Sequence, residues 1–540
     1  MLCLCFACNN QSQSLESDPF SKNVRPTEAR TPEQEKAGFQ LPPGFEIQLF
    51  ASEPNIGKPL NMAFDSKGRM WLTQSNDYPF PDSNLTGNDQ ISILEDTDGD
   101  GVADKFTIFA DSLNIPIGIT TVPDGAIAYS IPHIYHFIDK DGDDQADQRK
   151  EILSGFEYKD THGMINNFVR SWDGWIHADH GFANNSKVYG IGTDTLAMSS
   201  GNTFRFKPDG SQVEFTTTGR VNPFGYAYDE WGYTYSVDCH TSPVYQLVRG
   251  ADYPHFGKQP TGIGFGPALM KHEYGATALA GLDYYLANQF PEDYRESFFY
   301  GDVVKSRVYR LKMNMENGTT PTLTQEDDFI VSADPWFRPV DVKIGPDGAL
   351  YIADFYNRII GHYEVPLDHP GRDRHSGRIW RITWKGQSAP VEDLANKSME
   401  PLIGYLSHPN LSLRMAAADQ IVDRFGESAV EPIKNTLANS ETESISYIQG
   451  LWILFRLDAL SDDLLTAAIN HSDPTVKVHA LRVMFELPGL SSALVSLARD
   501  ALQIPNPHIQ RQPTKKKKKN PEVENIPLLL KLRKTVSEEA

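Results

Sequence analysis

Cysteine is nearly absent from the body of this 540-residue sequence. Its four cysteines are Cys3, Cys5, Cys8 and Cys239, so three of them stand in the first eight residues. One cysteine beyond the N-terminus cannot form an internal disulfide framework. No stretch approaches the roughly 20 consecutive apolar residues of a membrane span, so we expect membrane contact only through a lipid anchor.

The sequence also has fewer basic than acidic residues. The chain has 71 acidic and 50 basic residues, a formal charge of −21, which opposes binding to nucleic acid or anionic lipid and favours small molecules and cations as partners. The length exceeds one compact core, so at least two domains are expected. Abundant glycine (40), proline (36) and aromatic residues (11%) favour many short strands joined by turns.

The N-terminus, MLCLCFACNNQSQS, resembles the end of a secretion signal running into a polar linker, here assigned to residues 1–38. Cys8 is placed like the lipid-bearing cysteine of a bacterial lipoprotein. We therefore expect an exported, periplasmic or cell-surface protein that is lipid-anchored at Cys8. The alternative is an apolar N-terminus without a targeting role, because the stretch has no basic start and only a short apolar run.

One phrase, a strand followed by a glycine turn and another strand, recurs along the chain. It reads PLNMAFDSKGRMWL at 59–72, PIGITTVPDGAIAY at 116–129, INNFVRSWDGWIHA at 165–178, PFGYAYDEWGYTYS at 223–236 and PVDVKIGPDGALYI at 339–352. The last two turn glycines are 116 residues apart, which is twice the preceding interval of 58 residues. A sixth unit is therefore expected between them, near residue 290. Repeats of this length with several strands predict a six-bladed β-propeller over 39–386. An irregular β-sandwich is the alternative.

Beyond Gly386 the pattern becomes helical. Two segments, 408–422 and 471–485, each place a turn and a proline before apolar residues at helical spacing. We predict a HEAT-like all-α segment over 387–503, which makes the fold mainly β followed by helices. Residues 504–540 are predicted to be a solvated basic tail that includes Lys515–Lys519.

Two acidic loops have the spacing of calcium sites. The first, DTDGDGVAD, has glycine at its sharp sixth position, whereas the second, DKDGDDQAD, has Asp144 there. Alternate carboxylates of a tight loop converge on a cation, although both loops lack the glutamate that completes an EF-hand. The predicted ligands are Asp96, Asp98, Asp100, Asp104, Asp139, Asp141, Asp143 and Asp147. Solvated acidic turns are the alternative.

Several chemically active residues stand at ends of blade strands. Three histidines, His162, His177 and His180, fall within one repeat; a metal site at His177 and His180 and purely structural roles are alternatives. The other candidates are Arg220, Asn222, Lys305 and Arg338. Cations that converge on one channel mouth from separate blades would bind a carboxylate-rich ligand, although each could be only a structural ion-pair member.

Residues 40–384 resemble the six-bladed propeller of soluble quinoprotein glucose and sorbosone dehydrogenases. They resemble more closely the membrane-bound dehydrogenases of planctomycetes, verrucomicrobia and bacteroidetes, in which HEAT repeats and a c-type haem domain often follow the propeller. The phrases that carry the resemblance are LPPGFEIQLFASEP, DTHGMINNFVRSWDGW, RVNPFGYAYD and the run from 337 to 383.

The resemblance implies pyrroloquinoline quinone (PQQ) and calcium as cofactors and a sugar or other alcohol as substrate. His162 would be the general base, Arg220 and Asn222 would lie beside quinone and substrate, and Lys305 and Arg338 would hold the quinone carboxylates. We also expect His177 and His180 near the cofactor. The sequence departs from the family at Val221, which interrupts the Arg-Asn pair, and it contains no C-x-x-C-H haem motif. Electrons would then leave through an external acceptor such as a c-type cytochrome, or through a domain missing from this chain.

The sequence leaves three functions open. The first is a PQQ-dependent dehydrogenase in which His162 takes the hydroxyl proton and Asp160 or Asp179 orients it. The second is a non-catalytic scaffold that binds a glycan or protein partner. The third is a hydrolase or lyase that uses His162 and nearby acids.

Overall fold

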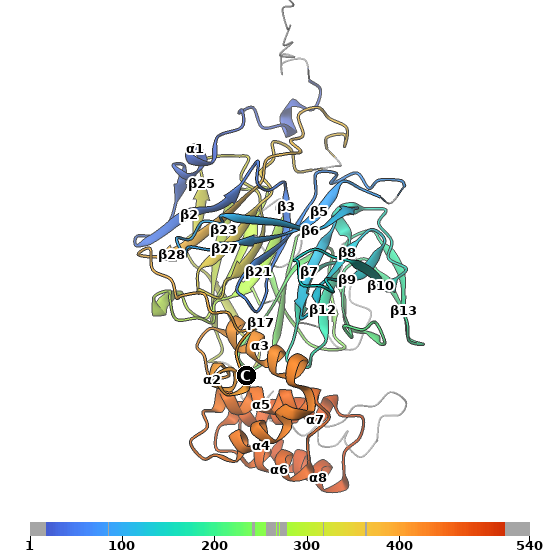
Figure 1. Ribbon diagram of the computed structural model, residues 1–540, viewed down its shortest axis with the longest axis vertical. Coiled ribbons are helices and arrows are strands. Elements are labelled where there is room, and N and C mark those ends of the chain that lie inside the picture. Colours follow the sequence, from blue (N-terminus) through green and yellow to red (C-terminus); the bar gives the residue numbers. More distant parts are fainter. Residues whose placement is uncertain are drawn as a thin grey trace, which may run out of the picture.

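In the computed structural model, six β-sheets stand around a common axis and a block of helices lies beneath them (Figure 1). The structure describes residues 18–512, apart from Leu85, 240–242, 255–265, 267–268, 271–277, Asn317 and 362–363. The expected lipid-anchor residue Cys8 and the basic run Lys515–Lys519 lie outside the described residues.

Each sheet is one blade, and its first strand contacts the first strands of both neighbouring blades, which closes the ring. The first blade consists of β3 (Pro59–Phe64), β4 (Met70–Gln74), β5 (Asp89–Glu95) and β6 (Lys105–Leu113). The second consists of β7 (Ile117–Val122), β8 (Gly125–Ser130), β9 (His133–Ile138) and β10 (Gln148–Ser154), extended by β13 (Asn185–Gly190) and β14 (Thr195–Ser199). The third consists of β11 (Asn166–Arg170), β12 (Ile176–His180), β15 (Asn202–Phe206), β16 (Val213–Gly219) and β20 (Asp252–Tyr253).

The remaining blades complete the propeller. The fourth blade consists of β17 (Pro223–Tyr228), β18 (Thr234–Asp238) and β19 (Val244–Leu247). The fifth consists of β21 (Leu279–Tyr284), β22 (Ser297–Asp302), β23 (Arg307–Asn314), β24 (Thr322–Gln325), β25 (Ile330–Ser332) and β1 (Phe39–Gln40). The sixth consists of β26 (Pro339–Ile344), β27 (Leu350–Asp354), β28 (Arg378–Trp384) and β2 (Phe45–Ser52). Because β2 pairs with β28, the N-terminal strand covers the edge of the last blade. The predicted six-bladed propeller is confirmed.

Turn glycines and bulges explain the repeated phrase. All five turn glycines, Gly68, Gly125, Gly174, Gly232 and Gly348, have positive φ, as the turns require. Every first strand also has a β-bulge near its start. Polar side chains of these strands accept hydrogen bonds from the next blade: Asn61 accepts from the Gly118 N–H and Asp341 from the Met62 N–H. The repeat therefore builds the blades and also joins them.

The propeller has two distinct ends. We call the end where the first strands begin the start face and the end with the glycine turns the turn face. The helices pack on the turn face (Figure 1): α2 (Met399–Tyr405), α3 (Leu411–Gln420), α4 (Val430–Ala438), α5 (Ser444–Arg456), α6 (Asp462–Asn470), α7 (Pro474–Glu486), α8 (Ser492–Ala501) and α9 (Pro507–Gln510). Asn410, the N-cap of α3, donates to the carbonyls of Gly345 and Pro346 in a blade turn. The predicted all-helical segment is confirmed.

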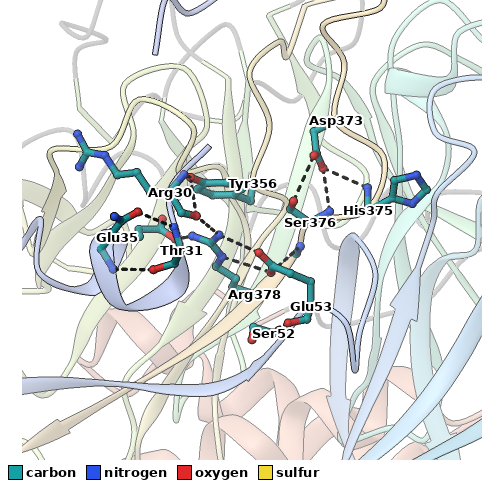
Figure 2. A network of polar contacts seen from close by, with 12 residues as sticks. Arg30, Thr31, Glu35, Ser52, Glu53, Tyr356, Asp373, His375, Ser376 and Arg378 are labelled. Atoms are coloured by element: carbon teal, nitrogen blue, oxygen red, sulfur yellow. Dashed lines mark hydrogen bonds and ion pairs between the residues drawn. The ribbon is translucent and has the colours of Figure 1, made fainter. Parts of the chain in front are cut away.

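Residues 18–36, which include α1 (Pro32–Lys36), lie on the start face. Figure 2 shows how Arg378 fixes them: its guanidinium pairs with Glu35 of α1 and, at 2.8 Å, with Glu53. The Tyr356 hydroxyl accepts a hydrogen bond from the Arg30 N–H at 2.7 Å. This segment therefore covers part of the start face.

Candidate functional site

His162, Asn222 and Arg338 each stand just before a first strand, on the start face. His162 lies in a short 3₁₀ turn (Thr161–Gly163) ahead of β11, and its carbonyl accepts a hydrogen bond from Asn222 Nδ2 at 3.0 Å. Nε2 of His162 is 3.4 Å from the Ile360 carbonyl, and Arg338 Nε donates to the Asn357 carbonyl at 3.0 Å. The structure thus brings His162 and Asn222 into contact and places His162 and Arg338 against the same short segment, 357–360.

Among the described residues, the carboxylate at ion-pair distance from the His162 ring is that of Asp160. It accepts the His162 backbone N–H at 2.9 Å and lies 4.0 Å from Nδ1. The Tyr78 ring lies against the imidazole, with centroids 5.0 Å apart. Asp179, the other orienting group considered, instead lies 3.7 Å from Arg220, and burial raises its pKa to about 7. Of the two aspartates expected to orient His162, Asp160 is therefore the one at ion-pair distance from its ring.

Two buried arginines on this face lack a full set of partners. Arg338 donates to the carbonyls of Asn357 and Val303, yet within the described ranges no carboxylate lies at ion-pair distance from it. Burial, together with the charge of Arg25, lowers the pKa of Arg338 to about 9. Arg220 has one carboxylate at ion-pair distance, Asp179 at 3.7 Å, and donates to Ser236 Oγ at 2.8 Å, while its Nε has no hydrogen-bond partner among the described residues. Buried cations without close anions are costly, so this face is suited to an anionic ligand.

Sequence reasoning missed a third cation, Lys58. It precedes Pro59 of β3 as Arg338 precedes Pro339 of β26, so a comparison of the repeats predicts a cation at this position. Its Nζ donates to the Tyr356 carbonyl at 2.8 Å and pairs with Asp373 at 2.8 Å, while burial lowers its pKa to about 8. The predicted ligand Lys305 follows β22 and is half-buried, and its N–H donates to Asp302.

His177 and His180 lie inside the blades and are not brought together with His162. His180 is buried, with Nδ1 2.7 Å from the Ser200 carbonyl and Nε2 2.8 Å from Ser186 Oγ, and burial lowers its pKa. His177 contacts the Tyr226 hydroxyl at 2.9 Å and lies 3.7 Å from Asp173. Both rings therefore contact blade residues, and their expected place near the cofactor stays a prediction.

Both acidic loops gather carboxylate oxygens. Two groups of three residues each hold ligand atoms within 4.8 Å of one another: Asp96, Asp98 and Asp104, and Asp139, Asp141 and Asp147. Asp100 and Asp143 lie outside these groups, and each accepts a backbone N–H two residues ahead. Asp144 takes a positive φ of 65° at the glycine position of its loop, and its carboxylate pairs with Arg69 at 2.8 Å.

A small hollow of about 10 Å³ lies beside His162 on the start face. Its lining includes Tyr78, Phe355, Asn357, Ile360 and Arg372. It is large enough for about one water. A larger ligand therefore needs the segment 355–360, which lines the hollow, to move.

Residues 31–386 match the family described as Domain of unknown function (DUF7133), and the chain therefore belongs to that family. A comparison with curated proteins found no match. Within the described part of the chain, no helix has the length and apolar character to cross a bilayer.

The propeller is similar to several solved structures. The PQQ-bound aldose sugar dehydrogenase from Streptomyces coelicolor is 14% identical, with a TM-score of 0.42 over 64% of this chain and 100% of that one. The holo PQQ domain of pyranose dehydrogenase from Coprinopsis cinerea is 14% identical, with a TM-score of 0.43 over 64% and 97%. A luciferin-regenerating enzyme is 13% identical, with a TM-score of 0.41 over 65% and 99%. At these identities the likeness concerns the fold alone.

Proposed function

We propose that the protein is a PQQ-dependent dehydrogenase that oxidises a sugar or another alcohol at the start face. The observation that carries the proposal is the pair of buried arginines, Arg220 and Arg338, on the same face as His162. Arg338 lies without a carboxylate at ion-pair distance within the described ranges, and the ring of His162 keeps about a fifth of its surface exposed. An anionic cofactor beside a basic imidazole is the combination that this face favours.

The donor set fits a carboxylate-bearing quinone. Arg338 and Lys305 would hold its carboxylates, with Arg220 and Asn222 beside the quinone and the substrate, and calcium would occupy the two acidic loops as a structural ion. When bound, the quinone would accept a hydride from the carbon that bears the substrate hydroxyl. The electrons would then pass to an external acceptor, for example a c-type cytochrome.

His162 would act on the substrate hydroxyl. Loss of hydride from the carbon makes the hydroxyl proton acidic, and a base within hydrogen-bond distance removes it. The Asp160 carboxylate, 4.0 Å from Nδ1, would stabilise the imidazolium and leave Nε2 to face the substrate. The Ile360 carbonyl now lies 3.4 Å from Nε2, so movement of this segment would both open the site and release the nitrogen.

A titration of the purified protein with PQQ and calcium, followed by absorbance, tests the proposal. We expect saturable binding by the wild type and reduction of the bound quinone when a sugar is added. Absence of PQQ binding would overturn the proposal and favour a non-catalytic propeller that binds a glycan or protein partner, with the helices, which we propose are HEAT-like, as a second surface.

A further inference from the structure

A hollow of about 560 Å³ lies at the opposite end of the channel, between the turn face and the helices. All six first strands contribute to its wall, and α3 closes it from below through residues such as Leu413 and Ala416. It extends to exposed residues of the blade turns, Lys67 and Asp124 among them, which gives it a path to solvent. Its size falls within the range of about 300 to 1,000 Å³ that is typical of small-molecule sites.

The repeat identifies two unusual residues in this wall. The fifth residue of the repeated phrase is Ala63, Thr120, Val169 and Ala227 in the first four blades. In the last two blades the same position is Asp283 and Lys343. These blades are neighbours, because β21 and β26 contact each other. The departure from the repeat thus puts one carboxylate and one ammonium side by side on the channel wall.

Asp283 and Lys343 both face the hollow. Each Asp283 oxygen accepts one backbone N–H, from Tyr284 at 2.8 Å and from Ile344 at 2.9 Å, which leaves further acceptor capacity. Burial raises the pKa of Asp283 to about 6, yet part of the side chain stays exposed because it lines the hollow. Lys343 is 18% exposed, and its Nζ lies 3.9 Å from Asp341. Neither group is fully satisfied by the closest protein atoms.

The rest of the wall pairs Arg69 and Arg170 with carboxylates and is rich in aromatic rings. Arg69 pairs with Asp65 and Asp144, both at 2.8 Å, and Arg170 donates to Asp423. These ion pairs leave neither of the two arginines free to bind an anionic ligand. The aromatic residues of the wall are Phe64, Trp71, Phe109, Phe168, Tyr226, Tyr228 and Tyr284. A ligand without net charge that has both hydroxyl groups and apolar faces matches this lining.

We propose that this hollow is a second binding site, for a neutral polyhydroxylated ligand of mono- or disaccharide size. Asp283 accepts a hydrogen bond from one hydroxyl, and Lys343 donates to the adjacent hydroxyl of a vicinal diol. The tyrosine and phenylalanine rings cover the C–H faces of the ligand. The site is separate from the start face and does not depend on the quinone.

Calorimetric titration of the full chain with trehalose and, separately, with myo-inositol tests the site. Trehalose has no free anomeric hydroxyl, so its binding is independent of oxidation at that carbon. We expect saturable binding of at least one of these polyols without PQQ, and no binding of L-serine, a zwitterion that the same charged pair would also attract. Binding of L-serine alone, or of none of the three, would overturn the proposal.

Three variants locate the binding. Asp283→Asn and Lys343→Met each remove one charged partner and should weaken binding by about tenfold or more. Ala416→Phe fills the hollow from α3 without removing a polar group and should abolish binding. This variant therefore tests whether the ligand occupies the hollow even if Asp283→Asn fails to fold. His162→Asn, at the other end of the channel, should bind as the wild type does. Unchanged binding in Ala416→Phe would overturn the assignment to this hollow.

Discussion

The two ends of the propeller channel differ in charge balance and in space. On the start face, no carboxylate in the described ranges lies at ion-pair distance from the buried Arg338 guanidinium, and the hollow beside His162 holds only about 10 Å³. On the turn face, Arg69 and Arg170 are paired with carboxylates, and the hollow is about 560 Å³. The comparison teaches that charge pairing indicates the kind of ligand: an unpaired cation favours an anion, whereas paired arginines with aromatic walls favour a neutral ligand.

The cover of each end also differs. Residues 18–36 and the segment that carries Tyr356 to Arg378 lie over the start face, and they are held by Arg378, Glu35 and Glu53 (Figure 2). A packed helix, α3, closes the turn face, where Asn410 anchors it to a blade turn. Opening the start face therefore requires movement of loop segments, while the turn face is bounded by a helix.

The largest expected effect concerns catalysis at the start face. We predict that His162→Asn lowers turnover by about a hundredfold or more while PQQ still binds, because a general base is lost. His375, an exposed histidine of the same face, provides the matched control, and His375→Asn should keep wild-type turnover. Equal turnover in His162→Asn and wild type, measured with the same sugar, would show that His162 is not the general base.

The next prediction is about calcium binding at the turn face, where Asp139 and Asp144 of the second acidic loop line the hollow. A ligand that binds only the folded state stabilises it by about 2.7 kcal/mol per site at a hundred times Kd. Chelation with EGTA should therefore lower the melting temperature, and Asp96→Asn and Asp139→Asn should each remove part of the effect. Asp111→Asn, an exposed aspartate outside both loops, is the control. An unchanged melting temperature, with no calcium found by mass spectrometry, would make both loops plain acidic turns.

A pH dependence is expected where the helices meet the turn face. His479 of α7 accepts from Trp452 Nε1 at 2.9 Å and donates to the Glu230 carbonyl at 2.8 Å, and burial lowers its pKa from 6.5 to about 3. The unfolded chain takes up this proton as pH falls below 6.5 and the folded chain does not. The free energy of unfolding should therefore fall by about 2 kcal/mol from this residue between pH 7 and pH 5.

His479→Gln isolates that contribution, since glutamine keeps an acceptor for Trp452 and a donor for Glu230 but does not titrate. Urea unfolding at pH 7 and pH 5 should show a loss smaller by about 2 kcal/mol in the variant than in the wild type. Equal losses in the two proteins would show that the histidine takes up its proton in the folded state as well.

The smallest predicted effect is on cofactor affinity. Arg338→Gln removes the unpaired charge but keeps a donor for the Asn357 carbonyl, so PQQ should bind about tenfold more weakly with little change in fold. Quinone affinity is measured by absorbance titration, with circular dichroism as the check on folding. Wild-type affinity in this variant would exclude Arg338 as a quinone ligand.

The fold could be predicted from the sequence because each blade repeats a local phrase. The glycine turns need positive φ, and Gly68 and Gly348 reveal them without any long-range information. His162, Asn222 and Arg338 could be placed on one face for the same reason, since each precedes a first strand. Lys58 occupies the same position as Arg338 and could have been found by comparing the repeats.

The hollow on the turn face could not be predicted. Asp283 and Lys343 are visible as departures from the repeat, but the space beside them exists only because α3 lies across the channel. The packing of that helix depends on tertiary contacts such as Asn410 with Gly345, which no local pattern encodes. The inward positions of His177 and His180 likewise depend on neighbouring strands, through Tyr226 and Ser186.

The most direct test of two separate sites is a calorimetric titration of Arg338→Gln and Ala416→Phe with PQQ and with the polyol, trehalose or myo-inositol, that the wild type binds. We predict a double dissociation, in which Arg338→Gln binds PQQ about tenfold more weakly and the polyol normally, while Ala416→Phe loses the polyol and binds PQQ normally. Loss of both ligands in either variant, or wild-type binding of both ligands in both variants, would contradict the account.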